Sequence, residues 1–289
     1  MNLSQAKKAL EQLKTVVDEN KLNIYDVSIE CEEGIVDKYY STCNVANNSY
    51  SVTKLYINTA IGILIDEDVL NLEDKVVDIL KDDISISYDP IWKEVSIAHC
   101  LGHNMGIDKG VLDSDCDDIN TYDTDDFLQR ALEYPPKFKP GTYRLYTDVP
   151  HYLLSRVITK KTGRIADEFI TDRLLNPCHY EATAFYRCPY KYTIGATGMF
   201  ARSKDTVKLA TLYLNKGLYH GQRYISESFV ILCENKEYDI YKYGQHFLGK
   251  TGMLGQMVMY NREKNYAVAW HSCGKDGHDK PLIDFFDKL

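Results

Sequence analysis

No stretch of this 289-residue sequence is apolar for long enough to span a bilayer as a helix. Its most apolar run, Leu55 to Ile65, is interrupted by Asn58 and Thr59. Positive charge is also scarce, because 34 lysines and arginines face 42 aspartates and glutamates, for a formal net charge of −8. An acidic chain lacks electrostatic attraction to nucleic acid or to an anionic membrane surface. We therefore expect neither a membrane span nor a nucleic-acid partner.

Signals for export and for disulfide bonding are missing as well. The N-terminal residues 1–20 contain no apolar core of the kind that a secretory signal has. The eight cysteines are scattered and form no C-x-x-C pair, and a chain of this length buries a core without covalent staples. The sequence therefore predicts free thiols and a cytoplasmic location.

Hydrophobic periodicity predicts strands at both ends of the chain and helices between them. Residues 25–40 alternate as a β-hairpin does, and residues 255–270 contain two more strands around a polar turn. The intervening signals are mostly helical. The economical architecture is an α+β fold, in which both chain ends build one antiparallel sheet flanked by helices. We expect a sheet domain formed by residues 1–65 and 186–289, and an inserted all-helical subdomain formed by residues 66–185.

Several predicted helices carry their own start and stop signals. Ser4 and Ser203 each precede an amphipathic stretch, where a serine side chain caps the first turn. Gly163 follows a helical pattern ending in lysines, which predicts a left-handed stop. The stretch that begins at Ser51 is apolar nearly all round, so it is expected to form a buried central helix.

The motif S-x-x-K places a serine and a lysine one turn apart on the same face of a helix. The sequence contains three copies, which begin at Ser4, Ser51 and Ser272. Ser4 precedes an exposed helix and Ser272 lies in a polar loop, whereas Ser51 begins the buried helix. A helix start favours a developing alkoxide, and a buried lysine can act as a base. Ser51 and Lys54 are therefore the candidate nucleophile and base.

Two further motifs complete a candidate site. K-T-G occurs at residues 161–163, where it ends a helix, and at residues 250–252, where it leads into a strand. A glycine in a strand lets a substrate approach the backbone closely, which favours the second copy. Tyr146 follows a Pro-Gly turn and precedes a helix, and a tyrosine held near lysines can serve as a general base.

The order S-x-x-K, Y-x-D, K-T-G resembles the serine penicillin-recognising superfamily, in particular the branch of class C β-lactamases, D-alanyl carboxypeptidases and related esterases. Residues 93–107 are similar to that branch's "LLTHTSGL" segment. Residues 140–158 and 198–226 resemble its "PG…YSN…YYLLG" and "GL…S..DLAKF" stretches. The resemblance covers roughly residues 51–270 and implies the fold of the β-lactamases and transpeptidases.

The resemblance also implies roles for individual residues. Ser51 is acylated, and Lys54 and Tyr146 share the base and acid work. Lys250 and Thr251 bind the substrate carboxylate.

Neighbouring positions complete the implied substrate-binding site. Gly252 belongs to the same K-T-G segment, and the backbone N–H groups of Met253 and Ser51 form an oxyanion hole, which stabilises charge that develops in the transition state. Asp148 stands where the family more often has asparagine. We expect its carboxylate to pair with Lys54 or Lys250 and to hold that lysine in its charged form.

These roles imply a serine hydrolase that forms an acyl-enzyme on a carboxylate-bearing amide or a β-lactam, with a small-molecule or peptide-like substrate. A carboxylesterase of the same family is the first alternative. The second is a penicillin-binding or sensor module without turnover, which Asp148 and the compact chain favour.

Other constellations are weaker. His99 and His103 have the helical spacing of metal ligands, but no glutamate lies between them and His103 falls on the family's conserved-motif histidine, so no metal and no cofactor are expected. The acidic segment from Asp113 to Asp126 lacks the order of a calcium loop and is expected to be solvated.

The assignment makes a geometric prediction. The Lys54 ammonium and the Tyr146 hydroxyl both approach Ser51 Oγ. Lys250 faces the same cleft from an edge strand and has no structural partner in its local sequence, which suggests that it awaits an anion.

Overall fold

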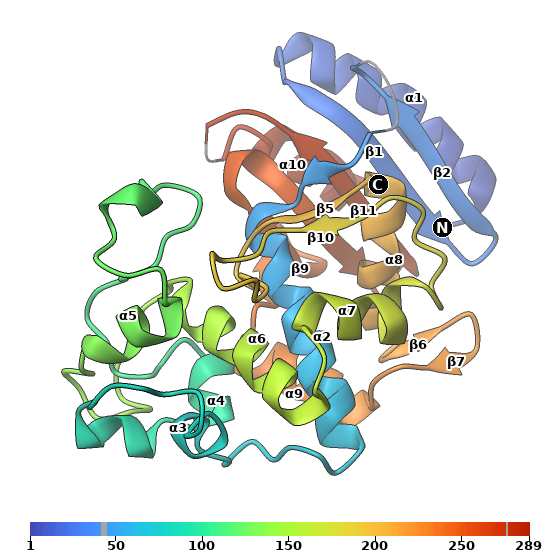
Figure 1. The fold of residues 1–289 in the computed structure, drawn as a ribbon. Helices are drawn as coiled ribbons and strands as arrows, with labels where there is room; N and C mark the ends of the chain where they lie inside the picture. The colour runs from blue at the N-terminus through green and yellow to red at the C-terminus, as the bar shows by residue number, and fades with distance from the viewer. Residues whose placement is uncertain (42–44, 276) are drawn as a thin grey trace.

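A six-stranded antiparallel sheet organises the computed structural model, which describes residues 1–41, 45–275 and 277–289. Its strands follow the order β2-β1-β11-β10-β9-β8, so the N-terminal hairpin lies beside the last strand of the chain (Figure 1). The prediction of one antiparallel sheet built from both chain ends is confirmed. The strands are β1 (Ile24–Cys31), β2 (Gly34–Tyr39), β8 (Tyr241–Tyr243), β9 (Phe247–Gly252), β10 (Gln256–Asn261) and β11 (Tyr266–Ser272).

The sheet is buried on both faces, and its side chains alternate between two cores. On β11, Val268 and Trp270 belong to one core, whereas Ala267 and Ala269 belong to the other. This alternation is the two-residue period of a pleated strand. Small alanines on one face allow close approach by a helix.

Helices cover both faces of the sheet. On one side α1 (Leu3–Glu19) and α10 (Lys280–Lys288) pack on the strands, and on the other α8 (Ser203–Leu214) crosses β1, β10 and β11 (Figure 1). The remaining helices are α2 (Thr53–Asp66), α3 (Val76–Ile79), α4 (Ile97–Leu101), α5 (Phe127–Glu133), α6 (Val149–Thr162), α7 (Ala166–Ile170) and α9 (Glu227–Lys236). Shorter turns are the 3₁₀ segments Tyr50–Val52, Pro90–Glu94, Ile119–Thr121 and Met253–Gly255 and the π segment Thr171–Leu175.

The central helix α2 is buried from Thr53 to Leu64, as its apolar sequence predicts. It runs between the helices α3 to α6 and the sheet (Figure 1). One continuous core includes residues of α2, α6, α8 and β10. The division into a sheet domain and a helical subdomain, at residues 66–185, stays a prediction.

Two predicted helix caps are wrong. Asn2 rather than Ser4 caps α1, in a reciprocal arrangement with Gln5 that satisfies two otherwise unpaired N–H groups. Ser203 is the first residue of α8, and its hydroxyl bonds the Ser28 hydroxyl of β1 at 2.7 Å. A tertiary contact thus uses the Ser203 hydroxyl, which the local pattern assigns to capping. Gly163 does end α6 with a φ of +69°, as predicted.

The sequence pattern did not predict the short strands. These are β8 and the small sheet of β3 (Asn47–Asn48), β5 (Met199–Ala201) and β4 (Ala184–Phe185), together with the pair β6 (Leu218–Tyr219) and β7 (Gln222–Arg223). Segments of two or three residues carry too little periodicity to detect.

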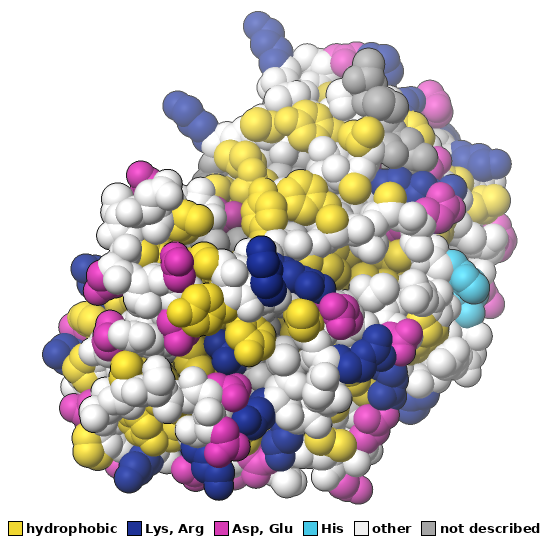
Figure 2. Space-filling view, in the orientation of Figure 1, with side chains coloured by type: hydrophobic (Ala, Val, Ile, Leu, Met, Phe, Trp, Pro, Cys, Tyr) yellow, Lys and Arg dark blue, Asp and Glu magenta, His cyan; other side chains and the backbone are white. Residues whose placement is uncertain are grey.

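Three properties of the surface and composition complete the description. No helix among the described residues has the length and apolarity needed to cross a membrane. The seven described cysteines are all free, and Cys43 lies outside the described residues. Acidic and basic side chains are interspersed over the face in Figure 2.

Gly62 allows α2 to pack against α9, and we predict that Gly62→Ala destabilises the protein. A Cβ at this position would lie 2.6 Å from two ring atoms of Phe229. Alanine favours a helix interior by about 1 kcal/mol over glycine, but overpacking in a core costs about 1–3 kcal/mol. We therefore expect a net loss in the free energy of unfolding, measured by urea denaturation. Adding Phe229→Leu should recover part of the loss caused by Gly62→Ala, and a simple sum of the two single effects would contradict the packing argument.

Candidate active site

Ser51 lies in the 3₁₀ turn that precedes α2, in a strained stretch of backbone. Tyr50 has a φ of +46°, which side-chain-bearing residues rarely adopt, and its N–H donates to Asn48 Oδ1 at 2.8 Å. Gly252 at the end of β9 passes so close that an added Cβ would lie 2.5 Å from Ser49 O and 3.2 Å from Ser51 N. The K-T-G glycine is therefore needed for the approach of two backbone segments.

Lys54 is fully buried one turn along from Ser51, and its ammonium has three acceptors. It donates to Ser51 Oγ at 3.2 Å, to Asp148 Oδ1 at 2.8 Å and to the carbonyl of Ala196 at 2.9 Å. Burial alone would lower the pKa of Lys54, but the charge of Asp148 and its hydrogen bond to the ammonium raise that pKa above its ordinary value. The expected pairing of Asp148 with Lys54 is confirmed.

Tyr146 lies between the two lysines of the motifs. Its hydroxyl accepts from Lys250 Nζ at 2.8 Å, while Lys54 Nζ is 4.9 Å from its ring centre. The ring stacks on His103 at 4.5 Å between centres, and Tyr146 remains 43% exposed. No hydrogen bond joins the Tyr146 hydroxyl to Ser51 Oγ. The predicted approach to Ser51 is therefore seen as a hydrogen bond for Lys54 but not for Tyr146.

Lys250 does have a structural partner, contrary to the sequence expectation. Its ammonium is 2% exposed and donates to Asp239 Oδ1 at 2.7 Å. Asp239 lies 11 residues before Lys250, in the segment between α9 and β8, where the local pattern gives no sign of its role. Lys250 therefore has an internal counter-charge that its local sequence does not reveal, and its contact with a substrate anion stays a prediction.

The strand that carries Lys250 is also not an edge strand throughout. β8 pairs with β9 from Phe247 to Gly249, and β10 pairs with its other side. Beyond Gly249, the edge of β9 that faces β8 is covered by a side chain, because Thr251 N–H donates to the Tyr243 hydroxyl at 3.0 Å. Lys250 to Gly252 thus form the open end of an interior strand.

Asp239 is the centre of a buried cluster that sequence reasoning missed. Besides Lys250, its carboxylate contacts His103 Nε2 at 3.3 Å, His151 Nε2 at 3.0 Å and Asn58 Nδ2 at 3.4 Å. Burial would raise the pKa of the Asp239 carboxyl, but Lys250 and the two histidines hold it well below its usual range.

Burial also disfavours the charged forms of the two imidazoles in this cluster. It lowers the pKa of His103, and it lowers the pKa of His151 to about 4 despite the attraction of Asp239. Lys250 is therefore the main ion-pair partner of the Asp239 carboxylate within the cluster.

His103, His151 and Asp239 are also the one group of described residues with the spacing of metal ligands. Two observations favour hydrogen bonding over a metal. The Lys250 ammonium already pairs with Oδ1 of the carboxylate, and neither Nδ1 atom has a hydrogen-bond partner, whereas a metal-bound histidine almost always donates its other N–H. His99, the other metal candidate, instead caps α4 through Ser96.

The motif residues line one pocket of about 490 Å³. Ser51, Tyr146, Lys250, Thr251, Gly252 and Met253 all contribute to it, together with Arg144, Tyr241, Gly255, Gly277 and Asp279. Lys54 and Asp148 lie behind Ser51 rather than on the pocket wall. The structure thus brings all eight sequence-predicted residues into one neighbourhood.

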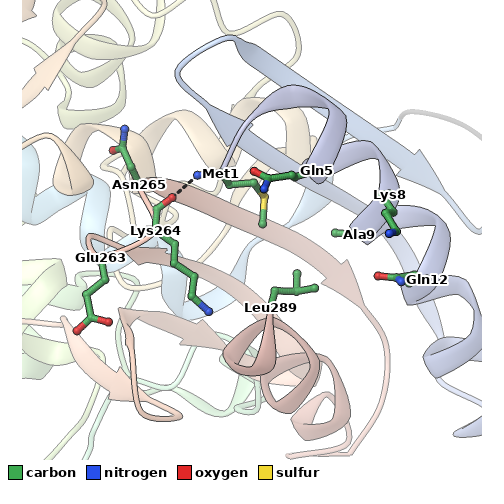
Figure 3. Close-up of a pocket in the computed structure, with 9 residues that line it drawn as sticks. All are labelled: Met1, Gln5, Lys8, Ala9, Gln12, Glu263, Lys264, Asn265 and Leu289. Atoms are coloured by element: carbon green, nitrogen blue, oxygen red, sulfur yellow. Dashed lines mark hydrogen bonds between the residues drawn. The ribbon is translucent and has the colours of Figure 1, made fainter.

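A second cavity, of about 530 Å³, lies between α1, the β10–β11 turn and the C-terminus (Figure 3). In it the Met1 ammonium donates to the carbonyl of Lys264. Its lining contains no serine, cysteine or histidine, so it has no nucleophile–base pair. The chemistry is therefore assigned to the Ser51 pocket.

Asp115 also approaches the site, although the acidic segment was expected to be solvated. Its Oδ1 accepts from the buried hydroxyl of Thr197 at 2.8 Å, next to the Ala196 carbonyl that binds Lys54. Burial raises the pKa of Asp115 to about 6, and the charge of Asp148 adds to this effect. Most of the segment is exposed, as expected, and Asp115 is one of its partly buried residues.

Comparison with known proteins places this geometry in a family. The family model "Beta-lactamase" matches residues 48–286. One similar solved structure is an octameric penicillin-binding protein homologue from Pyrococcus abyssi, with a TM-score of 0.75 and 20% identity over 97% of this chain and 76% of the other. A second is a penicillin-binding protein from Bacillus halodurans, with a TM-score of 0.72 and 16% identity over 96% of this chain and 100% of the other. A third is a family VIII carboxylesterase, with a TM-score of 0.76 and 16% identity over 97% of this chain and 96% of the other.

The pairing of Asp148 with Lys54 predicts a pH effect. Asp148→Asn keeps an acceptor for the ammonium but removes the negative charge, so the pKa of Lys54 should fall. Deprotonation of the base then occurs at lower pH, and the acidic limb of the kcat/KM profile should move downward by about one pH unit. Steady-state rates from pH 5 to 10 measure the shift.

A matched control is Asp83→Asn, because Asp83 pairs with Lys160 and Arg156 away from the pocket. An acidic limb that stays in place in Asp148→Asn, or that moves equally in the control, would mean that the Asp148 charge does not act on the catalytic base.

Proposed function

This chain belongs to the beta-lactamase family and is a serine hydrolase of that family, and we propose that it works by acylation of Ser51. The observation that carries the proposal is the contact of a fully buried lysine ammonium with a serine hydroxyl, Lys54 Nζ to Ser51 Oγ at 3.2 Å. An activated nucleophile generally has a base within hydrogen-bond reach, and a third group holds that base in place. Asp148 is that third group.

We assign the chemical steps as follows. Once the Lys54–Tyr146 pair has lost one proton to solvent, Ser51 Oγ attacks the substrate carbonyl, and the serine proton passes to that pair. The same pair returns the proton to the leaving group, which departs and leaves an ester on Ser51. Water then attacks the ester, its proton is taken by the pair, and Ser51 leaves with a proton restored.

The backbone of the K-T-G segment supports stabilisation of the oxyanion. The close approach of Gly252 to Ser51 N brings the next residue, Met253, to the same side of the pocket as the nucleophile. Two backbone N–H groups aimed at the developing charge are worth about 10²–10³-fold in rate for each donor in other acyl hydrolases. The pair Ser51 N and Met253 N stays our proposal for this hole.

For the substrate we propose a carboxylate-bearing amide, peptide-like compound or β-lactam, and a carboxylesterase activity as the alternative. A penicillin-binding protein and a carboxylesterase are both among the similar folds, so fold alone does not choose between them. A sensor that acylates without turnover is the remaining candidate, and the charged state of Lys54 favours it because deacylation also needs a base. A cytoplasmic location stays a prediction.

We predict that Ser51→Ala abolishes turnover and leaves the fold intact. Removing a nucleophile that acts as part of a unit costs orders of magnitude in rate. A panel of a chromogenic cephalosporin, a D-Ala-D-Ala peptide and a p-nitrophenyl ester measures turnover. Ser4→Ala is the matched control, because Ser4 begins the same S-x-x-K string on the exposed helix α1.

Intact-mass spectrometry after mixing with penicillin separates the remaining classes. A transient adduct indicates a hydrolase, a permanent adduct indicates a sensor, and ester turnover without an adduct indicates an esterase. Near-normal hydrolysis or an undiminished adduct in Ser51→Ala would refute the assignment of the nucleophile.

A further inference from the structure

The two motif lysines do not give the pocket a net positive charge. Lys54 is paired with Asp148 at 2.8 Å and Lys250 with Asp239 at 2.7 Å, and both lysines are nearly inaccessible. An anion that approached Lys250 would also meet the charge of Asp239, which is bonded to the same ammonium. Attraction of a substrate carboxylate therefore requires a cation that has no carboxylate of its own.

Among the described residues that line the pocket, Arg144 is the one cation without a carboxylate partner. Its guanidinium is held in place by neutral oxygens, because Nε donates to the Gly102 carbonyl at 3.3 Å and Nη2 to the Tyr241 hydroxyl at 2.7 Å. Nη1 makes no hydrogen bond within the described chain. The side chain is exposed and is therefore available to a ligand.

We propose that Arg144, rather than Lys250, recognises the anionic group of the substrate. A planar guanidinium fixed by two hydrogen bonds presents its remaining N–H groups in a defined direction, and it binds carboxylates in a bidentate manner. Arg144 lines the same pocket as Ser51 and Tyr146, so the anion is held in the pocket that contains the nucleophile. This inference rests on the proposed function and defines its substrate class: acyl compounds with a carboxylate on the part that enters the Arg144 side of the pocket.

Lys250 then acts as a positioning residue. It is bonded to the Tyr146 hydroxyl at 2.8 Å, and its ammonium is oriented by Asp239. The other carboxylate on the pocket wall, Asp279, is 4% exposed at the start of α10, so it presents far less to a ligand than Arg144 does.

Two esters of equal length test the inference, mono-p-nitrophenyl adipate, which bears a terminal carboxylate, and p-nitrophenyl hexanoate, which does not. The measured quantity is the ratio of their kcat/KM values. Loss of one charge-assisted contact at an exposed site should lower this ratio by about tenfold in Arg144→Ala, mainly through KM. Arg144→Lys should retain part of the preference for the carboxylate-bearing ester. Sodium chloride should lower the ratio in the unmodified protein, since it screens exposed charges.

Two variants serve as controls. Arg164→Ala removes an exposed arginine that pairs with Asp172 outside the pocket, and it should leave the ratio unchanged. Lys250→Ala should reduce both kcat/KM values by similar factors and leave the ratio unchanged, because it acts through Tyr146. An unchanged ratio in Arg144→Ala, or a fall in Lys250→Ala alone, would overturn the inference.

Binding to Ser51→Ala separates this inference from the proposed function, because it requires no chemistry. N-phenyl adipamic acid and N-phenylhexanamide are anilide counterparts of the two esters, and their affinities are measured by NMR titration. The acid should bind about tenfold more tightly than the neutral anilide, and Arg144→Ala in the same background should remove the preference. Equal affinities would overturn the role of Arg144, whereas turnover by Ser51→Ala would overturn the proposed function alone.

Discussion

The burial of two lysine ammonium groups is the constraint on which the site depends. A buried charge is tolerated only when it is paired and hydrogen-bonded. Lys54 meets this requirement through Asp148, the Ala196 carbonyl and Ser51, and Lys250 meets it through Asp239 and Tyr146. These contacts join α2, the start of α6, the turn before β8 and β9. The fold and the catalytic geometry are therefore maintained by the same few interactions.

The two ion pairs differ in how completely they are satisfied. Asp239 is fully buried and contacts a lysine, two histidines and an asparagine, so its removal would leave several groups unpaired. Asp148 uses one oxygen for Lys54, and its Oδ2 has no hydrogen-bond partner in the described chain. A change of charge at position 148 is therefore easier to accommodate than one at position 239, which makes Asp148 the better position at which to probe the base.

The sequence was sufficient for the features that local patterns encode. The buried helix after Ser51, the terminal hairpin and the strands β10 and β11 follow from hydrophobic periodicity, and the three motifs converge on one pocket. Asp239, His151 and Arg144 were not found, because most of the groups that they contact are far away in the chain. The same limit explains the Ser203 error, since its hydroxyl bonds a strand 175 residues away.

Charge balance changes how the K-T-G lysine is understood. The motif alone suggests an exposed cation that attracts a substrate anion, but in the structure Asp239 neutralises Lys250 and both lie inside the protein. The strength of an ion pair to a substrate depends on the net field at the pocket, not on the presence of a lysine in a motif. In our proposal the neutralised lysine orients Tyr146 through their hydrogen bond, and Arg144 supplies the positive charge that a substrate carboxylate meets at the pocket wall. Catalysis and substrate selection are thus assigned to different cations.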